Sequence, residues 1–184
     1  DKAVLHGGTA IWRCYHGRRF SEDLDFHFPK DKEKIELLFE RLAKLGFQVI
    51  KKKVSETSVY SELVLDRTSV RLEATFQKIS RVICDYEMSD GTFISVYSLT
   101  PEQFLVEKAR TYLKRFKVRD LWDIFFLLKL VEHPVEIPEL GSVIKQYQQP
   151  PDEGDLKTIL LEGIVPSADE MLEYIKRTWE RKNT

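Results

Sequence analysis

The chain has 184 residues, of which 42% are hydrophobic and 32% are charged, and its formal net charge is −1. This composition predicts a folded domain, or a small core with a helical appendage, and excludes an intrinsically disordered chain. The near-zero net charge excludes a globally basic nucleic-acid binder, so any basic surface must be local.

The cysteines also limit the class of protein. Cys14 and Cys84 are the two cysteines, they lie far apart, and they lack CxxC spacing. They favour neither a zinc site nor a disulfide scaffold and indicate a reducing compartment, so we expect a cytoplasmic protein. No apolar run approaches the roughly 20 residues of a membrane helix, so no membrane partner is expected. Because the sequence opens directly on a strand pattern, we expect a leading element to be missing or unusually short.

The first elements combine a short strand, a glycine turn and a strand that carries acids. Residues 3–11 indicate a strand that runs into a double-glycine turn and then a helix. Residues 22–28 alternate in polarity, so that Asp23, Asp25 and His27 share one face of a strand and apolar side chains share the other. The acids therefore lie on one side of an element whose other side enters the core.

A helix and further strands are expected next. Asp31 is a suitable N-cap for a helix that stops at Gly46. A turn at Asp66 separates two of the strands that follow, and Asp90 with Gly91 indicates a hairpin. The expected strands cover residues 47–54, 58–65, 69–76, 81–88 and 92–98.

The pattern becomes helical from Thr100 onward. Thr100 is followed by a proline and, three residues later, by Gln103, which is typical of a capped helix start. Ser167 and Glu170 form a similar start for a final helix. The expected helices cover 101–115 and 119–133, with a polar, proline-bearing stretch over 134–154 before the final helix.

These elements predict an α+β fold with two parts. Residues 1–99 are expected to form a mixed sheet flanked by helices, and residues 100–184 are expected to form a helical lobe packed on that core. No internal repeat and no low-complexity segment interrupts this order.

The strand acids are candidate metal ligands. Asp23 and Asp25 are two residues apart on a strand, so their side chains point the same way with a separation of roughly 7 Å. Glu73 lies on the polar face of a neighbouring strand pattern and would supply a third carboxylate. Three carboxylates suit Mg²⁺ or Mn²⁺, and two such ions favour in-line phosphoryl or nucleotidyl transfer.

The double glycine is a candidate phosphate site. Gly7 and Gly8 lack side chains, so a triphosphate could approach their backbone amides and the positive N-terminal end of the following helix. Thr9 could add a hydroxyl contact. With the nearby acids, this pattern predicts an NTP as substrate.

At this point the sequence resembles the AbiEii/AbiGii-type nucleotidyltransferases, the toxin components of type IV toxin–antitoxin pairs. The resemblance rests on the double-glycine start, on the Arg-x-Ser-x-Asp-x-Asp stretch from Arg19 to Asp25, and on a later helical motif, and it covers roughly Val4 to Leu128. The later motif comprises Glu107, Lys108, Arg115, Arg119, Asp120 and Asp123.

The resemblance implies a nucleotidyltransferase-like fold and a role for each matched residue. It implies that Asp23 and Asp25 hold Mg²⁺, that Lys108 binds the triphosphate, and that Asp120 completes the catalytic set. The phosphate-binding set is then Gly7, Gly8, Thr9, Arg19, Ser21 and Lys108. Some relatives act on tRNA acceptor ends, so RNA is the expected acceptor and a cognate antitoxin is an expected partner.

Each of these residues has a structural alternative. Asp23 and Asp25 could form salt bridges with Arg18, Arg19 or Arg71, and Glu73 could lie on a solvated face. Lys108 could belong to a charged helix face, and Asp120 could cap the following helix.

The basic residues between 108 and 119 also have two interpretations. They could form a polyanion track to the metal site, or a solvated face balanced by acids. The function has alternatives as well: a nucleotidyltransferase that modifies a small molecule such as an antibiotic, or a non-catalytic nucleotide- or partner-binding module on the same fold.

Overall fold

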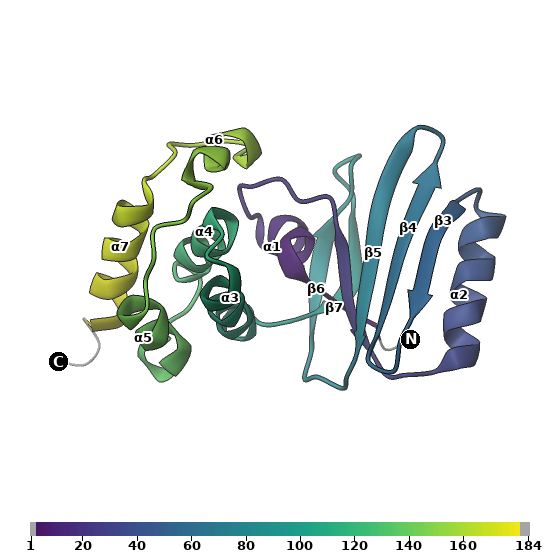
Figure 1. The fold of residues 1–184 in the computed structure, drawn as a ribbon, viewed down its shortest axis with the longest axis horizontal. Coiled ribbons are helices and arrows are strands. Elements are labelled where there is room, and N and C mark those ends of the chain that lie inside the picture. Colours follow the sequence, from purple (N-terminus) through teal and green to yellow (C-terminus); the bar gives the residue numbers. More distant parts are fainter. Residues whose placement is uncertain (1–2, 181–184) are drawn as a thin grey trace. The chain divides into compact units, whose positions relative to one another are not determined.

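The computed structural model of the chain describes residues 3–180 (Figure 1). The chain divides into two compact units. The first unit comprises Asp1–Tyr15 and Ser21–Leu99, and the second comprises His16–Phe20 and Thr100–Thr184. The Arg19-to-Asp25 stretch is therefore shared, because Arg19 and Phe20 fall in the second unit and the residues from Ser21 onward fall in the first.

A seven-stranded mixed sheet is the centre of the first unit, with strand order β3-β4-β5-β2-β1-β7-β6. The expected strands and the hairpin are all present, and together with the helices they confirm the α+β prediction. The strands are β1 (Val4–His6), β2 (Leu24–Phe28), β3 (Gln48–Val54), β4 (Ser58–Leu65), β5 (Thr68–Phe76), β6 (Val82–Glu87) and β7 (Phe93–Ser98).

The register of the central strands decides which side chains are neighbours. β2 pairs with β5 in parallel, and Asp25 is the register partner of Glu73. On its other side β2 pairs with β1 in antiparallel fashion, and His6 is the partner of Asp25. Since adjacent strands lie about 4.8 Å apart, these pairings gather polar side chains on one face of the sheet.

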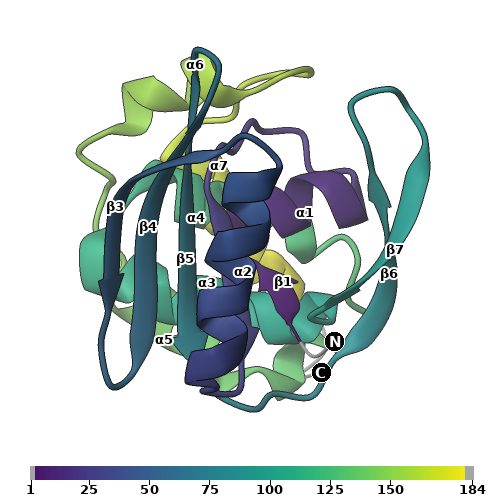
Figure 2. The same ribbon diagram turned by 90° about the vertical axis from the view of Figure 1, so that its right-hand side faces the viewer.

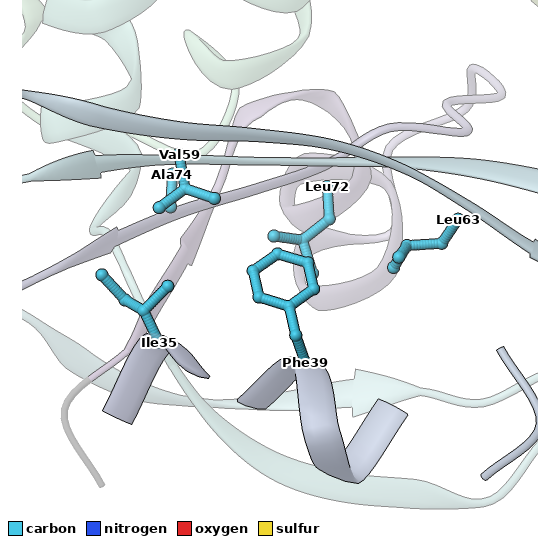
Figure 3. Close-up of a cluster of buried hydrophobic side chains, with 6 residues drawn as sticks. All are labelled: Ile35, Phe39, Val59, Leu63, Leu72 and Ala74. Atoms are coloured by element: carbon cyan, nitrogen blue, oxygen red, sulfur yellow. The ribbon is translucent and has the colours of Figure 1, made fainter. Parts of the chain in front are cut away.

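Helices α1 (Gly7–Tyr15) and α2 (Lys32–Lys44) lie on opposite faces of this sheet (Figures 1 and 2). Ile35 and Phe39 of α2 enter a buried cluster with Val59, Leu63, Leu72 and Ala74 of β4 and β5 (Figure 3). Asp31 caps α2 as expected, because its side chain accepts a hydrogen bond from the Lys34 backbone N–H. The apolar face of the sheet is thus anchored by α2, which leaves the polar face on the side of α1.

Helices form the second unit. They are α3 (Pro101–Arg115), α4 (Val118–Leu127), α5 (Pro138–Lys145), α6 (Leu156–Ile159) and α7 (Ala168–Glu180), with short 3₁₀ turns at Pro134–Glu136 and Glu153–Asp155. Thr100 and Gln103 make the expected capping box at the start of α3. Ser167 and Glu170 do the same for α7.

Two expectations for this unit are wrong. α4 ends at Leu127 rather than at residue 133, because Lys129 and Leu130 donate to carbonyls three residues back and tighten the chain into a turn. The stretch 134–154 contains α5, which the prolines concealed. Pro138 stands at the first helical position, where it is tolerated, and Leu140 and Val143 are buried.

No helix within residues 3–180 combines the length and the apolar character that crossing a membrane requires.

Candidate active site

The three predicted metal ligands lie on the polar face of the sheet. Asp25 and Glu73 are side by side on parallel strands, and Asp23 comes directly before β2. Glu73 therefore lies on a strand next to β2, where the third acid was expected. Burial, and then the charge of Asp25, raises the pKa of the Glu73 carboxyl.

Gly7 brings the start of α1 against Asp25. Its φ is +73°, a left-handed conformation that favours glycine. A Cβ atom at this position would lie 2.1 Å from Asp25 Oδ2, a distance that no side chain can accept. The double glycine therefore allows the backbone at the helix N-terminus to approach a carboxylate directly.

Thr9 fixes the segment that carries Asp23. Its hydroxyl is buried and donates to the backbone carbonyl of Asp23 at 2.5 Å, with the carbonyl of Ser21 at 3.3 Å. In this structure the Thr9 hydroxyl is used to hold the 21–23 segment on α1, and not to present a free group to solvent. Thr9 thereby positions Asp23 relative to Gly7.

Arg71 is a cation that lies among these acids, and the sequence had indicated it as one possible salt-bridge partner of Asp23 and Asp25. Its guanidinium donates to both carboxylate oxygens of Asp23, at 2.6 to 2.9 Å, and lies 3.8 Å from Glu73 Oε1. The hydrogen bond to Asp23 raises the pKa of Arg71. The salt-bridge alternative is therefore realised for Asp23, through Arg71.

These residues fit a divalent cation by their chemistry. All three are carboxylates, the oxygen ligands that Mg²⁺ and Mn²⁺ prefer, and a positive group already lies among them. In the described residues they are not gathered into a closed ligand shell, because Asp23 is turned toward Arg71.

The remaining predicted residues belong to the second unit. Asp123 is fully buried and accepts two hydrogen bonds of 2.6 Å from Arg19. Lys108 Nζ lies 2.9 Å from Asp123 Oδ2 and 3.9 Å from Asp120 Oδ1. Arg115 in turn donates to both carboxylate oxygens of Asp120. Three cations and two acids thus form one network, in which Arg115 is exposed and the other four residues are buried.

The network explains the spacing of the helical motif. Asp120 and Asp123 are three residues apart on α4, so they share one face of the helix. Burial by itself would raise the pKa of Asp123, but the charges of Arg19 and Lys108 outweigh it and the pKa is lowered. Asp120 lies in the first turn of α4 and does not cap it, because the N-cap residue is Lys117. The capping interpretation of Asp120 is therefore wrong.

Two members of this network were missed as site candidates, although both stand in the matched motif. Arg115 and Asp123 were left out of the predicted catalytic and binding sets. The signal that could have found them is charge balance, since two buried acids on one helix face require more than one cation.

Most of the basic stretch between 108 and 119 is ion-paired. Lys108, Arg110, Arg115 and Lys117 each pair with a carboxylate. Of the two interpretations, the contacts therefore favour a helix face whose cations are balanced by acids over a continuous polyanion track. Its cations mainly stabilise the second unit.

Histidine side chains border the acids. The rings of His6 and His27 stack with their centroids 3.6 Å apart, and Nδ1 of the buried His27 lies 2.6 Å from Thr75 Oγ1. His27 shares the polar face as predicted, and the His6 ring and the Thr75 hydroxyl fix the position of its imidazole.

Comparison with known proteins places the chain in a family and a fold. The family model described as "Nucleotidyl transferase AbiEii toxin, Type IV TA system" matches residues 1–179. Among solved structures, JHP933 from Helicobacter pylori is similar, with a TM-score of 0.62 and 19% sequence identity over 99% of this chain and 87% of the other. At that identity the likeness shows a common fold alone. A search of curated proteins gave no match.

Proposed function

Since the chain belongs to the AbiEii family of nucleotidyl transferase toxins of type IV toxin–antitoxin systems, we propose that it transfers a nucleoside monophosphate from an NTP to an RNA acceptor. A tRNA acceptor end is the RNA that we expect. The observation that carries the proposal is the pairing of Asp25 with Glu73 on parallel strands, next to the glycine-rich start of α1.

Asp23, Asp25 and Glu73 are the proposed metal ligands. A bound Mg²⁺ or Mn²⁺ ion would supply neutralisation of the charge that develops on the transferred phosphoryl group and on the leaving pyrophosphate. Glu73 and Asp25 are also the groups that can accept the proton of the attacking hydroxyl. The hydroxyl oxygen then forms a bond to the α-phosphorus as the bond to pyrophosphate breaks.

The start of α1 is the proposed phosphate site. The backbone amides at Gly7 and Gly8 and the positive end of the helix favour an anion, and no acidic residue stands in the first turn of α1. Ser21 is a further candidate for a phosphate contact. Arg71, once it leaves Asp23, is free to bind phosphate as well.

The second unit contributes the positive charge of Lys108 to the proposed binding of the triphosphate. Lys108 is the proposed triphosphate-binding lysine, and it lies in one ion-pair network with Arg19, Asp120 and Asp123. Asp120 acts in this account by orienting the lysine.

Gly7→Ala is expected to lower nucleotidyl transfer about 10²-fold, because the added methyl group displaces the Asp25 carboxylate. The rate of transfer from a labelled NTP measures the effect. Gly91→Ala is the matched control, since Gly91 also has a positive φ of +80° but a Cβ there meets no atom within 4 Å. Equal activity of the two variants would contradict the proposed contact.

Family membership also suggests a growth-inhibiting role in the cytoplasm that a cognate antitoxin controls. The two free cysteines agree with a reducing compartment. Burial, with the neighbouring charges of Cys84 and Asp85, raises the pKa of Cys14 to about 12, so its thiol stays protonated.

The proposal is tested by incubating the protein with each α-labelled NTP, Mg²⁺ and total tRNA. Label that moves to RNA supports the function and identifies the nucleotide. Binding of NTP without transfer to RNA would redirect the search to a small-molecule acceptor. Absence of both transfer and Mg²⁺-dependent NTP binding would contradict the enzymatic function and favour a binding module.

A further inference from the structure

A cavity of about 840 Å³ lies in the second unit. It is bounded by α4, by α7, by the 162–166 segment before α7, and by Arg18. This volume falls in the range of small-molecule and nucleotide sites, about 300–1,000 Å³. Nothing in the proposed transfer chemistry uses it.

Aromatic rings form one wall of this cavity. Trp122 and Phe125 of α4 lie with ring centroids 5.5 Å apart, and Phe125 meets Tyr174 of α7 edge-on at 4.9 Å. Phe126 lines the same cavity. At the rim, Ile164 is 91% exposed, an apolar side chain left to water beside the aromatic wall. Such a wall suits a flat, partly apolar group.

Three cations stand around these rings. Lys129 Nζ lies 4.1 Å from the ring centroid of Phe125, and the Arg177 guanidinium lies 5.8 Å from that of Tyr174. Arg18 is the third. Burial first, and then the charge of Arg18, lowers the pKa of Lys129. Arg18 and Lys129 therefore repel one another at this cavity, and a bound anion would relieve that repulsion.

Three acids also line the cavity, and each contacts another group. Glu162 pairs with Arg18 at 3.4 Å, Glu170 caps α7 through Ser167, and Glu173 pairs with Lys176 at 2.8 Å. Within residues 3–180, neither Lys129 nor Arg177 has a carboxylate partner. Lys129 and Arg177 are therefore the two cations at the aromatic wall that no carboxylate contacts directly.

We propose that this cavity binds a nucleotide of a single-stranded RNA, with the base against the aromatic wall and the phosphate at Lys129 and Arg177. Aromatic rings on which bases stack, next to cations that contact the phosphates, are the combination by which proteins bind single-stranded nucleic acid. An acidic peptide would satisfy the cations but would leave the rings unused. The binding itself follows from the cavity, and its assignment to the acceptor RNA rests on the proposed function.

The test measures binding of a fluorescein-labelled single-stranded RNA of about eight nucleotides to the full chain by fluorescence anisotropy, without NTP or Mg²⁺. The double variant Lys129→Ala, Arg177→Ala and the single variant Tyr174→Leu are each expected to weaken binding about tenfold or more. Lys145→Ala, Lys157→Ala is the matched control, because it removes the same charge from exposed positions of α5 and α6. Thermal melting checks that every variant is folded.

Equal affinity of the cavity variants and the control would overturn the proposal. A second pattern would also overturn it: weak binding by the Lys129→Ala, Arg177→Ala variant together with full binding by Tyr174→Leu. That pattern would indicate a surface that binds any polyanion without base stacking. Displacement of the RNA by an oligoglutamate peptide at equal charge would identify an acidic-peptide site and also overturn it.

The outcome is separable from that of the proposed function. Asp25→Asn is expected to bind the RNA with native affinity while it fails to transfer a nucleotide. Native protein that binds RNA at this cavity but transfers no label would contradict the proposed function and leave the cavity assignment intact.

Discussion

Asp25→Asn is expected to reduce nucleotidyl transfer at least about 10³-fold, which corresponds to roughly 4 kcal/mol of lost transition-state stabilisation. Asp25 is the register partner of Glu73 and lies against Gly7 at the N-terminus of α1, so the amide removes charge from the proposed site. Single-turnover transfer from an α-labelled NTP measures the loss.

Asp66→Asn is the matched control for this variant. Asp66 is an exposed residue of the same unit with a φ of +54°, a conformation that asparagine adopts readily. It is expected to retain native activity. If Asp25→Asn kept more than about a tenth of native activity, Asp25 would not be a metal ligand or a base.

Asp123→Asn is expected to lower the free energy of unfolding by about 3–5 kcal/mol. The amide cannot neutralise Arg19 and Lys108, both buried, and it can accept only part of their hydrogen bonds. Urea denaturation followed by circular dichroism measures the loss. Because the pKa of Asp123 is lowered in the folded state, the native protein should lose this contribution as the pH falls through that pKa, whereas the variant should not.

Asp155→Asn provides the comparison, since Asp155 is an exposed acid of the same unit. It is expected to change the free energy of unfolding by less than about 0.5 kcal/mol. A loss below about 1 kcal/mol in Asp123→Asn would mean that the cations find other partners and that the network is not essential to the unit.

The strands and their faces could be predicted from the sequence because each follows a local rule. Alternation in residues 22–28 fixes the common face of Asp23 and Asp25, and the polar face of 69–76 fixes the direction of Glu73. That Asp25 and Glu73 are register partners could not be predicted, because strand order depends on contacts between segments distant in the chain.

The ion-pair partners of the charged residues also could not be predicted from the sequence. Arg19 precedes the acids of the sheet by a few residues, yet it pairs with Asp123, 104 positions away. Arg71 was one of several possible partners of Asp23, and its selection depends on the register of β5. The contact of Thr9 could not be predicted either. The Gly-Gly-Thr pattern indicates a phosphate contact and gives no sign that the Thr9 hydroxyl donates to the Asp23 carbonyl.

The central claim is that Asp23, Asp25 and Glu73 form a divalent-cation site. Its most direct test is a titration with Mn²⁺ in which electron paramagnetic resonance measures the free ion. Three proteins are compared: the native protein, the double variant Asp23→Asn, Asp25→Asn, and the single variant Asp66→Asn. We predict that the native protein and the Asp66 variant bind Mn²⁺ with the same affinity and that the double variant loses this binding. Equal binding by all three proteins would contradict the claim and move the metal site elsewhere.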